Sequence, residues 1–214
     1  MSRPRTPLLP VIALLCLVAT LSACGIGVDR EPRALQASTT TTTVPAQPSI
    51  GRVESILYYV NEGSFVPAST DLPDDDLTTV LQALLMPPPT TLGLSGTLSS
   101  IPAGTELLGL VRDDSRLTIN LSAAFDNVVG VSRQQAIGQM VLTVTERERF
   151  DAIEFQVEGK PILVSSPTQG DTPTVSACDF APELATEDDA ADASLSNDMT
   201  EVLDARRARL VDTC

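Results

Sequence analysis

The chain has 214 residues, of which 28 are Asp or Glu, 14 are Lys or Arg and none is His, giving a formal net charge of -14. The lack of histidine excludes a Ser-His-Asp triad and an HExxH zinc site, because both require imidazole. The acidic balance argues against nucleic-acid binding, which needs a basic patch to neutralise phosphates. The length suits one domain of ordinary size with extensions.

The first 23 residues have the pattern of an export signal. Arg3 and Arg5 precede an apolar run over residues 8–20, and small residues follow it. The run is shorter than the roughly 20 residues that span a bilayer, so a permanent transmembrane helix is not expected. Residues 21–24 (Leu-Ser-Ala-Cys) resemble the bacterial lipobox, whose cysteine is lipidated and becomes the first residue. We predict a lipoprotein signal peptide at residues 1–23 and lipidation of Cys24; the alternative is a simple export signal with an incidental cysteine.

The cysteines are consistent with a location outside the cytoplasm. Cys16 is removed with the signal and Cys24 carries the lipid, which leaves Cys178 and Cys214. An even pair in an oxidising compartment predicts a disulfide, with two free buried thiols as the alternative. A redox role is not expected, because the chain has no Cys-x-x-Cys pair. The mature protein is therefore predicted to lie on the outer face of the cytoplasmic membrane, held there by its lipid anchor.

Residues 24–50 are predicted to form a lipidated, flexible tether. They lack apolar periodicity, and the threonine run at residues 39–43 leads into Pro45 and Pro48. Such a composition cannot bury a core. A flexible stretch of this length has a root-mean-square reach of about 25–30 Å, enough to lift a domain clear of the lipid headgroups.

The folded part is predicted to open with a strand, a turn and a helix. Residues 56–60 are a β-branched and aromatic run that ends in Asn-Glu-Gly, and residues 65–68 are a candidate returning edge segment. A helix then carries one apolar stripe from Leu77 to Leu85 and stops at Pro87. The acidic run at residues 74–76 could bind a cation, but we favour its interpretation as a helix N-terminus, where carboxylates are stabilised.

The second half of the domain repeats this alternation. Residues 106–111 and 116–121 are predicted to form a hairpin, because turn residues separate two apolar runs. Ser132 and Gln135 fit a capping box that would start a second helix. Residues 152–157 alternate apolar and polar side chains as a half-buried strand, and an apolar arm follows at residues 162–164.

The order strand, helix, strand, strand, helix, strand predicts an α+β fold. We expect a two-layer sandwich, a βαββαβ-like sheet with both helices on one face, plus a C-terminal helix. That helix would begin after Ser196 and carry Arg206, Arg207 and Arg209 near its negative end. Contact with anionic headgroups is an alternative role for these arginines. The acidic residues between 170 and 198 read as a solvated loop.

Tests for catalytic motifs fail. Gly93-Leu94-Ser95-Gly96 has the wrong spacing for a nucleophile elbow, and the chain lacks the histidine that this motif needs. Asp171-Thr172-Pro173 superficially resembles an aspartic-protease segment, but it occurs once and Pro replaces the glycine. We therefore predict no catalytic residue, no cofactor and no metal site.

Several segments together resemble a known family. They are the Tyr-Tyr-Val strand, the Leu-rich helix before the prolines, Ile-Pro-Ala-Gly-Thr, the strand Leu-Thr-Ile-Asn-Leu, the helix Gln-Ala-Ile-Gly-Gln-Met and Phe-x-Val-Glu-Gly-Lys-Pro. In this order they resemble the GerMN domain of sporulation and spore germination proteins, which occurs in many actinobacterial lipoproteins. The resemblance implies a non-enzymatic extracytoplasmic module, which we place at residues 51–166. The residues after it predict an acidic loop and a C-terminal helix at residues 167–214.

Two functional hypotheses follow. The first is a membrane-anchored adaptor whose domain docks on another envelope protein, suggested by the anchor, the tether and the lack of a catalytic motif. The second is a binding protein for a small ligand or a cell-wall fragment, with the loop at residues 87–105 as one wall of a groove. An enzyme ranks a distant third.

Overall fold

A computed structural model describes residues 51–89 and 96–214. The predicted signal peptide, Cys24 and the whole of the predicted tether lie outside the described residues. In chain order the elements are β1 (Val53–Asn61), β2 (Ser64–Leu72), α2 (Leu77–Leu85), β3 (Thr97–Leu98), β4 (Leu107–Asp113), β5 (Arg116–Leu121), η2 (Ala123–Asn127), α3 (Gly130–Val144), β6 (Ala152–Val157), β7 (Lys160–Pro161), β8 (Val164–Ser166), β9 (Gly170–Thr172), α4 (Ala177–Phe180), η3 (Ala181–Glu183), α5 (Glu187–Asp192) and α6 (Asn197–Thr213).

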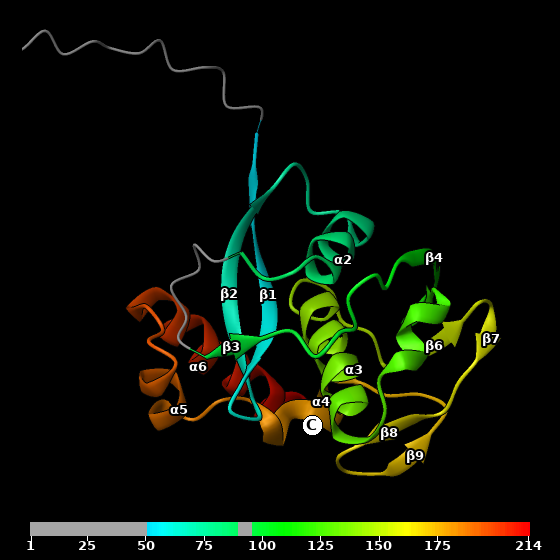
Figure 1. The fold of residues 1–214 in the computed structure, drawn as a ribbon. Coiled ribbons are helices and arrows are strands. Elements are labelled where there is room, and N and C mark those ends of the chain that lie inside the picture. Colours follow the sequence, from blue (N-terminus) through cyan, green and yellow to red (C-terminus); the bar gives the residue numbers. More distant parts are fainter. Residues whose placement is uncertain (1–50, 90–95) are drawn as a thin grey trace, which may run out of the picture. The chain divides into compact units, whose positions relative to one another are not determined.

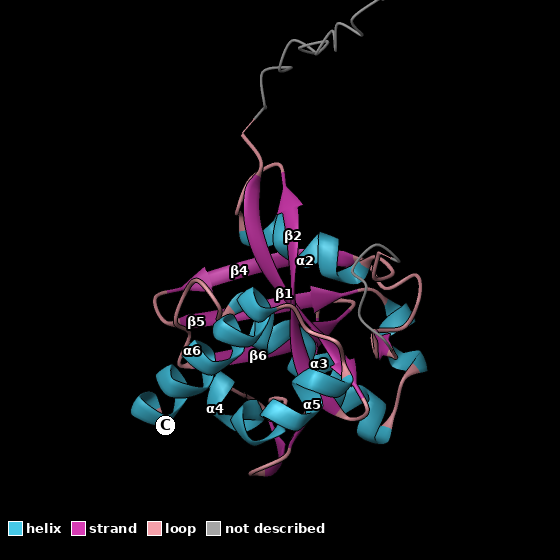
Figure 2. Cartoon of the chain, turned by 90° about the vertical axis from the view of Figure 1, so that its left-hand side faces the viewer, coloured by secondary structure: helices cyan, strands magenta, loops and turns pink. Residues whose placement is uncertain are grey.

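The fold is α+β, as predicted, and its strands form three sheets with the orders β2-β1-β3, β4-β5-β6-β7 and β8-β9. The hairpin β1–β2 turns at Glu62 and Gly63, whose φ angles are 49° and 100°. Such positive values suit a tight two-residue turn. Strand β5 pairs with β4 in antiparallel and with β6 in parallel orientation, so the second sheet is mixed. Figure 2 shows β4, β5 and β6 side by side.

The sequence predicted one sheet, whereas the structure separates the β1–β2 hairpin from β4–β7. Helix α3 lies between them (Figure 1). Two buried polar side chains of α3 bond to the edge of β1: Thr143 Oγ1 accepts from the Tyr58 N–H at 3.0 Å, and Gln139 Nε2 donates to the Tyr58 carbonyl at 3.1 Å. These bonds satisfy groups that a neighbouring strand would otherwise bond. The helix therefore takes the place of a strand at this edge.

Helix α2 forms where the apolar stripe predicts it. Leu77, Val80, Leu81 and Leu84 are buried. Asp76 is the N-cap and accepts a hydrogen bond from the Thr78 N–H at 2.8 Å, and this bond lowers the pKa of the Asp76 carboxyl. The interpretation of the acidic run as a helix N-terminus is confirmed.

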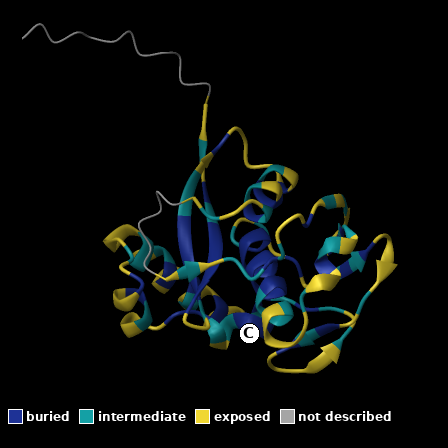
Figure 3. Cartoon of the chain, viewed as in Figure 1, coloured by how far each residue is buried: buried dark blue, intermediate teal, exposed yellow. Residues whose placement is uncertain are grey.

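Helix α3 is buried on all sides along much of its length, since every residue from 136 to 144 is buried (Figure 3). The predicted capping box is wrong: the helix starts at Gly130, and its N-cap Val129 makes no side-chain hydrogen bond. Close packing also fixes a glycine. A Cβ added at Gly138 would lie 2.3 Å from Phe65 Cζ and 2.8 Å from Phe180 Cδ1, so the two rings contact the helix backbone directly.

The segment predicted as an acidic loop is ordered. It contains β9, α4, η3 and α5, because Phe180, Ala185 and Ala190 are buried and side chains cap the short helices. Thr186 and Asp189 form a capping box at α5. Ser196 caps α6 by accepting from the Met199 N–H, so the predicted start of the C-terminal helix is confirmed.

Candidate functional site

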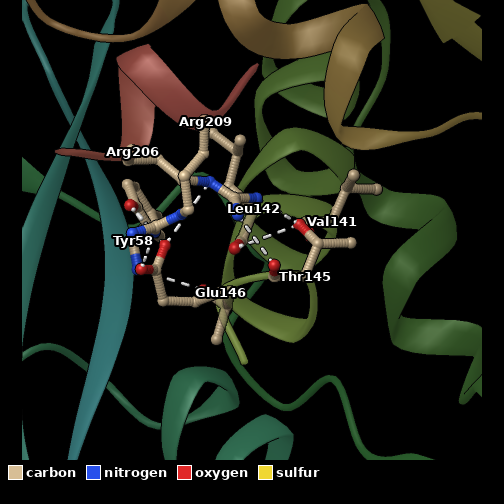
Figure 4. A network of polar contacts seen from close by, with 8 residues as sticks. Tyr58, Val141, Leu142, Thr145, Glu146, Arg206 and Arg209 are labelled. Carbon is tan, nitrogen blue, oxygen red and sulfur yellow. Dashed lines mark hydrogen bonds and ion pairs between the residues drawn. The ribbon is translucent and has the colours of Figure 1, made fainter. Parts of the chain in front are cut away.

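A buried polar network lies where the C-terminal end of α3 meets β1 and α6 (Figure 4). Arg206 is 4% exposed and donates from Nη1 to the Thr145 carbonyl at 2.8 Å and from Nη2 to Thr145 Oγ1 at 2.6 Å. Its Nε lies 3.4 Å from Glu146 Oε2. Glu146 also accepts from the Tyr58 hydroxyl at 2.9 Å and pairs with Arg209. The network fastens α6 to α3 and β1.

Burial is the main cause of the pKa shifts in this network. It raises the pKa of the Tyr58 hydroxyl well above its usual value, and the nearby Glu146 carboxylate raises it further. Burial also lowers the pKa of Arg206, while the attraction of Glu146 partly offsets that effect. Tyr58 is therefore protonated at neutral pH, and its hydroxyl donates a hydrogen bond to the Glu146 carboxylate, which pairs with two arginines. These groups suit a structural joint better than proton transfer to a substrate.

A charged cleft of about 370 Å³ opens beside the network. Arg147, Arg149, Arg206 and Arg209 line it, and each is paired with a carboxylate. Arg206 and Arg209 share Glu146, and Arg147 and Arg149 each have a carboxylate of their own, so most of the positive charge of this cleft is offset. Cys178, which also lines it, forms a disulfide with Cys214, with their Cα atoms 5.6 Å apart. The bridge ties the last residue of the chain to α4.

A second cleft, of about 600 Å³, lies at the end of the β1–β2 hairpin, and we call it the loop-end cleft. Glu62 and Gly63 of the hairpin turn form one side. Residues 96 and 98–102 form another, and η2 together with the start of α3 closes the third. Two hydrogen bonds hold the loop: the Ser100 N–H donates to Gln139 Oε1 at 2.7 Å, and Ser100 Oγ donates to Gln135 Oε1 at 3.1 Å.

Apolar side chains are exposed around the loop-end cleft. Leu98, which lines it, is 68% exposed. Val129 and Val131 flank the cleft-lining residues Val128 and Ser132 in sequence and are 73% and 69% exposed. Exposed apolar side chains gathered at one place mark interaction surfaces more often than scattered ones do. Sequence periodicity missed these valines because they lie in the turn that starts α3.

The loop-end cleft lies at the turn end of β1. The chain enters β1 at Val53 and reaches the turn after Asn61. Nine residues of strand at about 3.3 Å each span about 30 Å. The loop-end cleft and Val53, the first residue of β1, are therefore at opposite ends of the strand.

One buried carboxylate escaped the sequence analysis. Asp179 is 3% exposed and accepts from Ser166 Oγ at 2.6 Å, Thr168 Oγ1 at 2.9 Å, Gln169 Nε2 at 2.6 Å and the Ser176 N–H at 2.7 Å. Burial alone would raise the pKa of Asp179, but these bonds together hold it below its usual value. The side chain joins the β8–β9 hairpin to α4. The pattern Ser176-x-x-Asp179, a capping box, was the available signal.

The predicted site residues have different outcomes. Cys24 lies outside the described residues, whereas Cys178 and Cys214 form the expected bridge. Across residues 51–89 and 96–214, no three His, Cys, Asp or Glu side chains are grouped as metal ligands. Over the same ranges, no helix has the length and apolar character needed to cross a membrane.

Comparison with protein families gives one match. The model of the family described as "Germane: Sporulation and spore germination" matches residues 56–163. No curated protein matches the chain.

Several solved structures are similar, and two of them come from the same protein. The tandem GerMN domains of the sporulation protein GerM from Bacillus subtilis are 21% identical, with a TM-score of 0.48, over 60% of this chain and 48% of that one. The first GerMN domain of the same protein is 20% identical, with a TM-score of 0.46, over 63% of this chain and 98% of that one. The chain thus spans about half the length of the tandem structure.

Proposed function

The chain belongs to the sporulation and spore germination family, and from that premise we propose that it is a membrane-anchored extracytoplasmic lipoprotein whose GerMN-like domain is a non-enzymatic adaptor for another envelope protein. In this proposal residues 1–23 are the signal peptide and Cys24 carries the lipid. Residues 24–50 form the tether, residues 51–166 the GerMN-like domain, and residues 167–214 pack on it. The cytoplasmic membrane and an envelope protein are its partners.

The sequence supports the anchor. A charged start, a short apolar run and Leu-Ser-Ala-Cys at residues 21–24 occur in the order that lipoprotein signals require. Several acyl chains hold a protein at a bilayer far more firmly than one. Replacing Cys24 with Ala is expected to move the protein from the detergent phase to the aqueous phase in a phase-partition assay. Retention in the detergent phase would contradict lipidation at this residue.

One observation carries the adaptor role: Leu98, which lines the loop-end cleft, and Val129 and Val131, which adjoin its lining residues Val128 and Ser132 in sequence, are all exposed. Exposing three large apolar side chains to water is unfavourable. Burying each of them in an interface stabilises the complex by about 1.5–3 kcal/mol. The loop-end cleft lies about 30 Å along β1 from Val53, the first residue of that strand. A partner can therefore dock on it without contact with the membrane.

The polar groups of the domain are consistent with a non-enzymatic role. Glu146, Arg206 and Asp179 are all held in hydrogen bonds that join secondary-structure elements. A catalytic acid or base needs a free face toward a substrate. In this proposal these residues stabilise the surface on which the partner docks.

The experiment is capture of cross-linked partners from cells. Full-length protein and a Val129→Asp/Val131→Asp variant are cross-linked, purified and compared by mass spectrometry. Val211→Asp is the matched control, because Val211 is 80% exposed on α6, away from the loop-end cleft. We expect a discrete partner with the native protein and the control but not with the double variant. Equal capture by all three would refute the proposed surface.

A second candidate function rests on the same cleft. Residues 96 and 98–102 form a wall of it, as expected for a groove that binds a small ligand or a cell-wall fragment. In this case soluble wall fragments would slow hydrogen exchange at Ser100 and Ile101. A lack of protection with wall fragments, together with capture of a protein partner, would favour the adaptor.

A further inference from the structure

The edge of β1 has a gap at one residue. Successive residues of an antiparallel strand direct their N–H and C=O groups to opposite sides. Tyr58 directs its groups away from β2, toward Thr143 and Gln139 of α3. Ile56, two residues earlier, must direct its own groups the same way. Among the described residues, none bonds to Ile56 on this side.

Both neighbours of this gap are occupied. On one side, the Tyr58 groups are bonded to α3, and Val60 then pairs with Leu98 of β3. On the other side, the Glu54 carbonyl accepts from Arg147 Nη2 at 3.0 Å. The edge is therefore closed to a long added strand but open at a single position. An unpaired main-chain donor and acceptor at a sheet edge are a site for an extended peptide.

A cleft of about 510 Å³ opens at this position, and we call it the β1-edge cleft. Ile56 and Ser55 line it from the strand. Apolar side chains from α2, α3 and α6 complete its walls: Leu77, Val80, Val144, Met199 and Val202. The cleft can thus surround one aliphatic side chain of a segment that pairs with Ile56.

Ser55 supplies a second sign of a missing partner. Its side chain is 2% exposed, and among the described residues its Oγ has no hydrogen-bond partner. A buried hydroxyl without a partner is unfavourable, because the hydrogen bonds that it made to water are not replaced. A polar group brought into the β1-edge cleft would remove that cost.

The charge of the lining indicates the chemistry of the occupant. Four carboxylates and one guanidinium line the cleft, and they are Glu54, Asp75, Glu146, Asp198 and Arg147. Arg147 is paired with Asp75, and Glu146 is neutralised by α6. Glu54 and Asp198 therefore leave the rim negative, which favours a cationic segment.

We propose that the β1-edge cleft binds an extended, basic peptide segment of a partner protein. One residue of that segment exchanges main-chain hydrogen bonds with Ile56 and places an aliphatic side chain between Met199 and Val202. The adjacent basic side chains reach Glu54 and Asp198. This site is separate from the loop-end cleft, so it stands independently of the adaptor surface described above.

The test uses the full-length protein in mild detergent and a fluorescent probe peptide, Arg-Val-Arg-Val-Arg with blocked ends. Two further probes are its Glu-Val-Glu-Val-Glu counterpart and the arginine peptide methylated on both valine nitrogens. We expect only the unmethylated arginine peptide to bind, and its saturation to slow hydrogen exchange of the Ile56 N–H at least tenfold. The methylated peptide has no N–H on the valines that would pair with Ile56 and keeps the same side chains, so its loss of binding would report on main-chain pairing.

Two matched pairs of variants on α6 locate the binding. Val202→Trp, which fills the cleft, should weaken binding at least tenfold, whereas Val211→Trp should leave it unchanged. Asp198→Lys should weaken binding about fivefold relative to Asp212→Lys, at the other end of the same helix. If no probe binds at millimolar concentration, if the three probes bind equally, or if binding leaves exchange at Ile56 unchanged, the proposal is overturned. The probe comparison and the exchange of Ile56 need no substitution, so a variant that fails to fold cannot conceal the outcome.

Discussion

Replacement of Arg206 by Met tests the polar network most severely. The substitution keeps an unbranched side chain that can fill the space but removes the hydrogen bonds to the Thr145 carbonyl and hydroxyl at 2.8 and 2.6 Å. Hydrogen bonds to a charged group contribute about 1.5–3 kcal/mol each. Glu146 also loses one of its two arginine partners while its side chain is only 12% exposed. Removing one partner of a buried ion pair costs about 3–5 kcal/mol, and we expect a loss of stability in that range.

The assay is equilibrium unfolding in urea with the disulfide intact, with Arg149→Met as the control. Arg149 is 72% exposed and is paired with Asp151 on the surface, so its replacement should cost less than about 1 kcal/mol. Glu146→Gln combined with Arg206→Met should recover part of the loss, because it removes the partly unpaired carboxylate. Equal effects of Arg206→Met and Arg149→Met would refute the claim that the network fastens α6 to the domain.

Three further predictions concern stability. Gly138→Ala should destabilise the fold by about 1–3 kcal/mol in urea unfolding, since the new Cβ would lie 2.3 Å from Phe65 Cζ; a neutral effect would show that the rings can move freely. Folding lowers the pKa of Asp179, so its ionised carboxylate stabilises the fold above the unfolded pKa of about 3.9. That stabilisation is lost as the pH falls through the folded pKa. Asp179→Asn should therefore reduce the dependence of the free energy of unfolding on pH in this acid range, and an unchanged dependence would contradict the prediction. Cys214→Ser removes a disulfide that links residues 36 positions apart. On the loop-entropy model this should lower the free energy of unfolding by about 4 kcal/mol. An unchanged melting temperature would show that the bridge does not stabilise the fold.

Local patterns predicted the elements that bury one face. The stripe of α2 and the serine cap of α6 are encoded within single segments, so the sequence alone located them. The disulfide was predicted from the expected export and from the even number of remaining cysteines, and neither depends on the fold. The second predicted helix is also present as α3, but it starts at Gly130 rather than after Ser132, and the sequence did not show that its polar residues are buried too.

The missed features depend on contacts distant in sequence. Gln139 and Thr143 reach Tyr58 across more than 80 positions, and these bonds decide that a helix rather than a strand lies against β1. The acidic segment was expected to be a loop because its charges dominate its composition. In the folded chain, Phe180 and Ala190 are buried, and the carboxylates of Asp179 and Asp189 cap helices. Composition alone could not show that these carboxylates bond within the domain.

The central claim is that a partner docks on the apolar surface around the loop-end cleft. The most direct measurement places a photoreactive amino acid at position 129 or at position 211 of the membrane-anchored protein and irradiates living cells. Both side chains are exposed, at 73% and 80%, so both sites are equally open to an adjacent protein. The account predicts one discrete cross-linked species from position 129 and none from position 211. Identical adducts from both positions, or none from position 129, would contradict it.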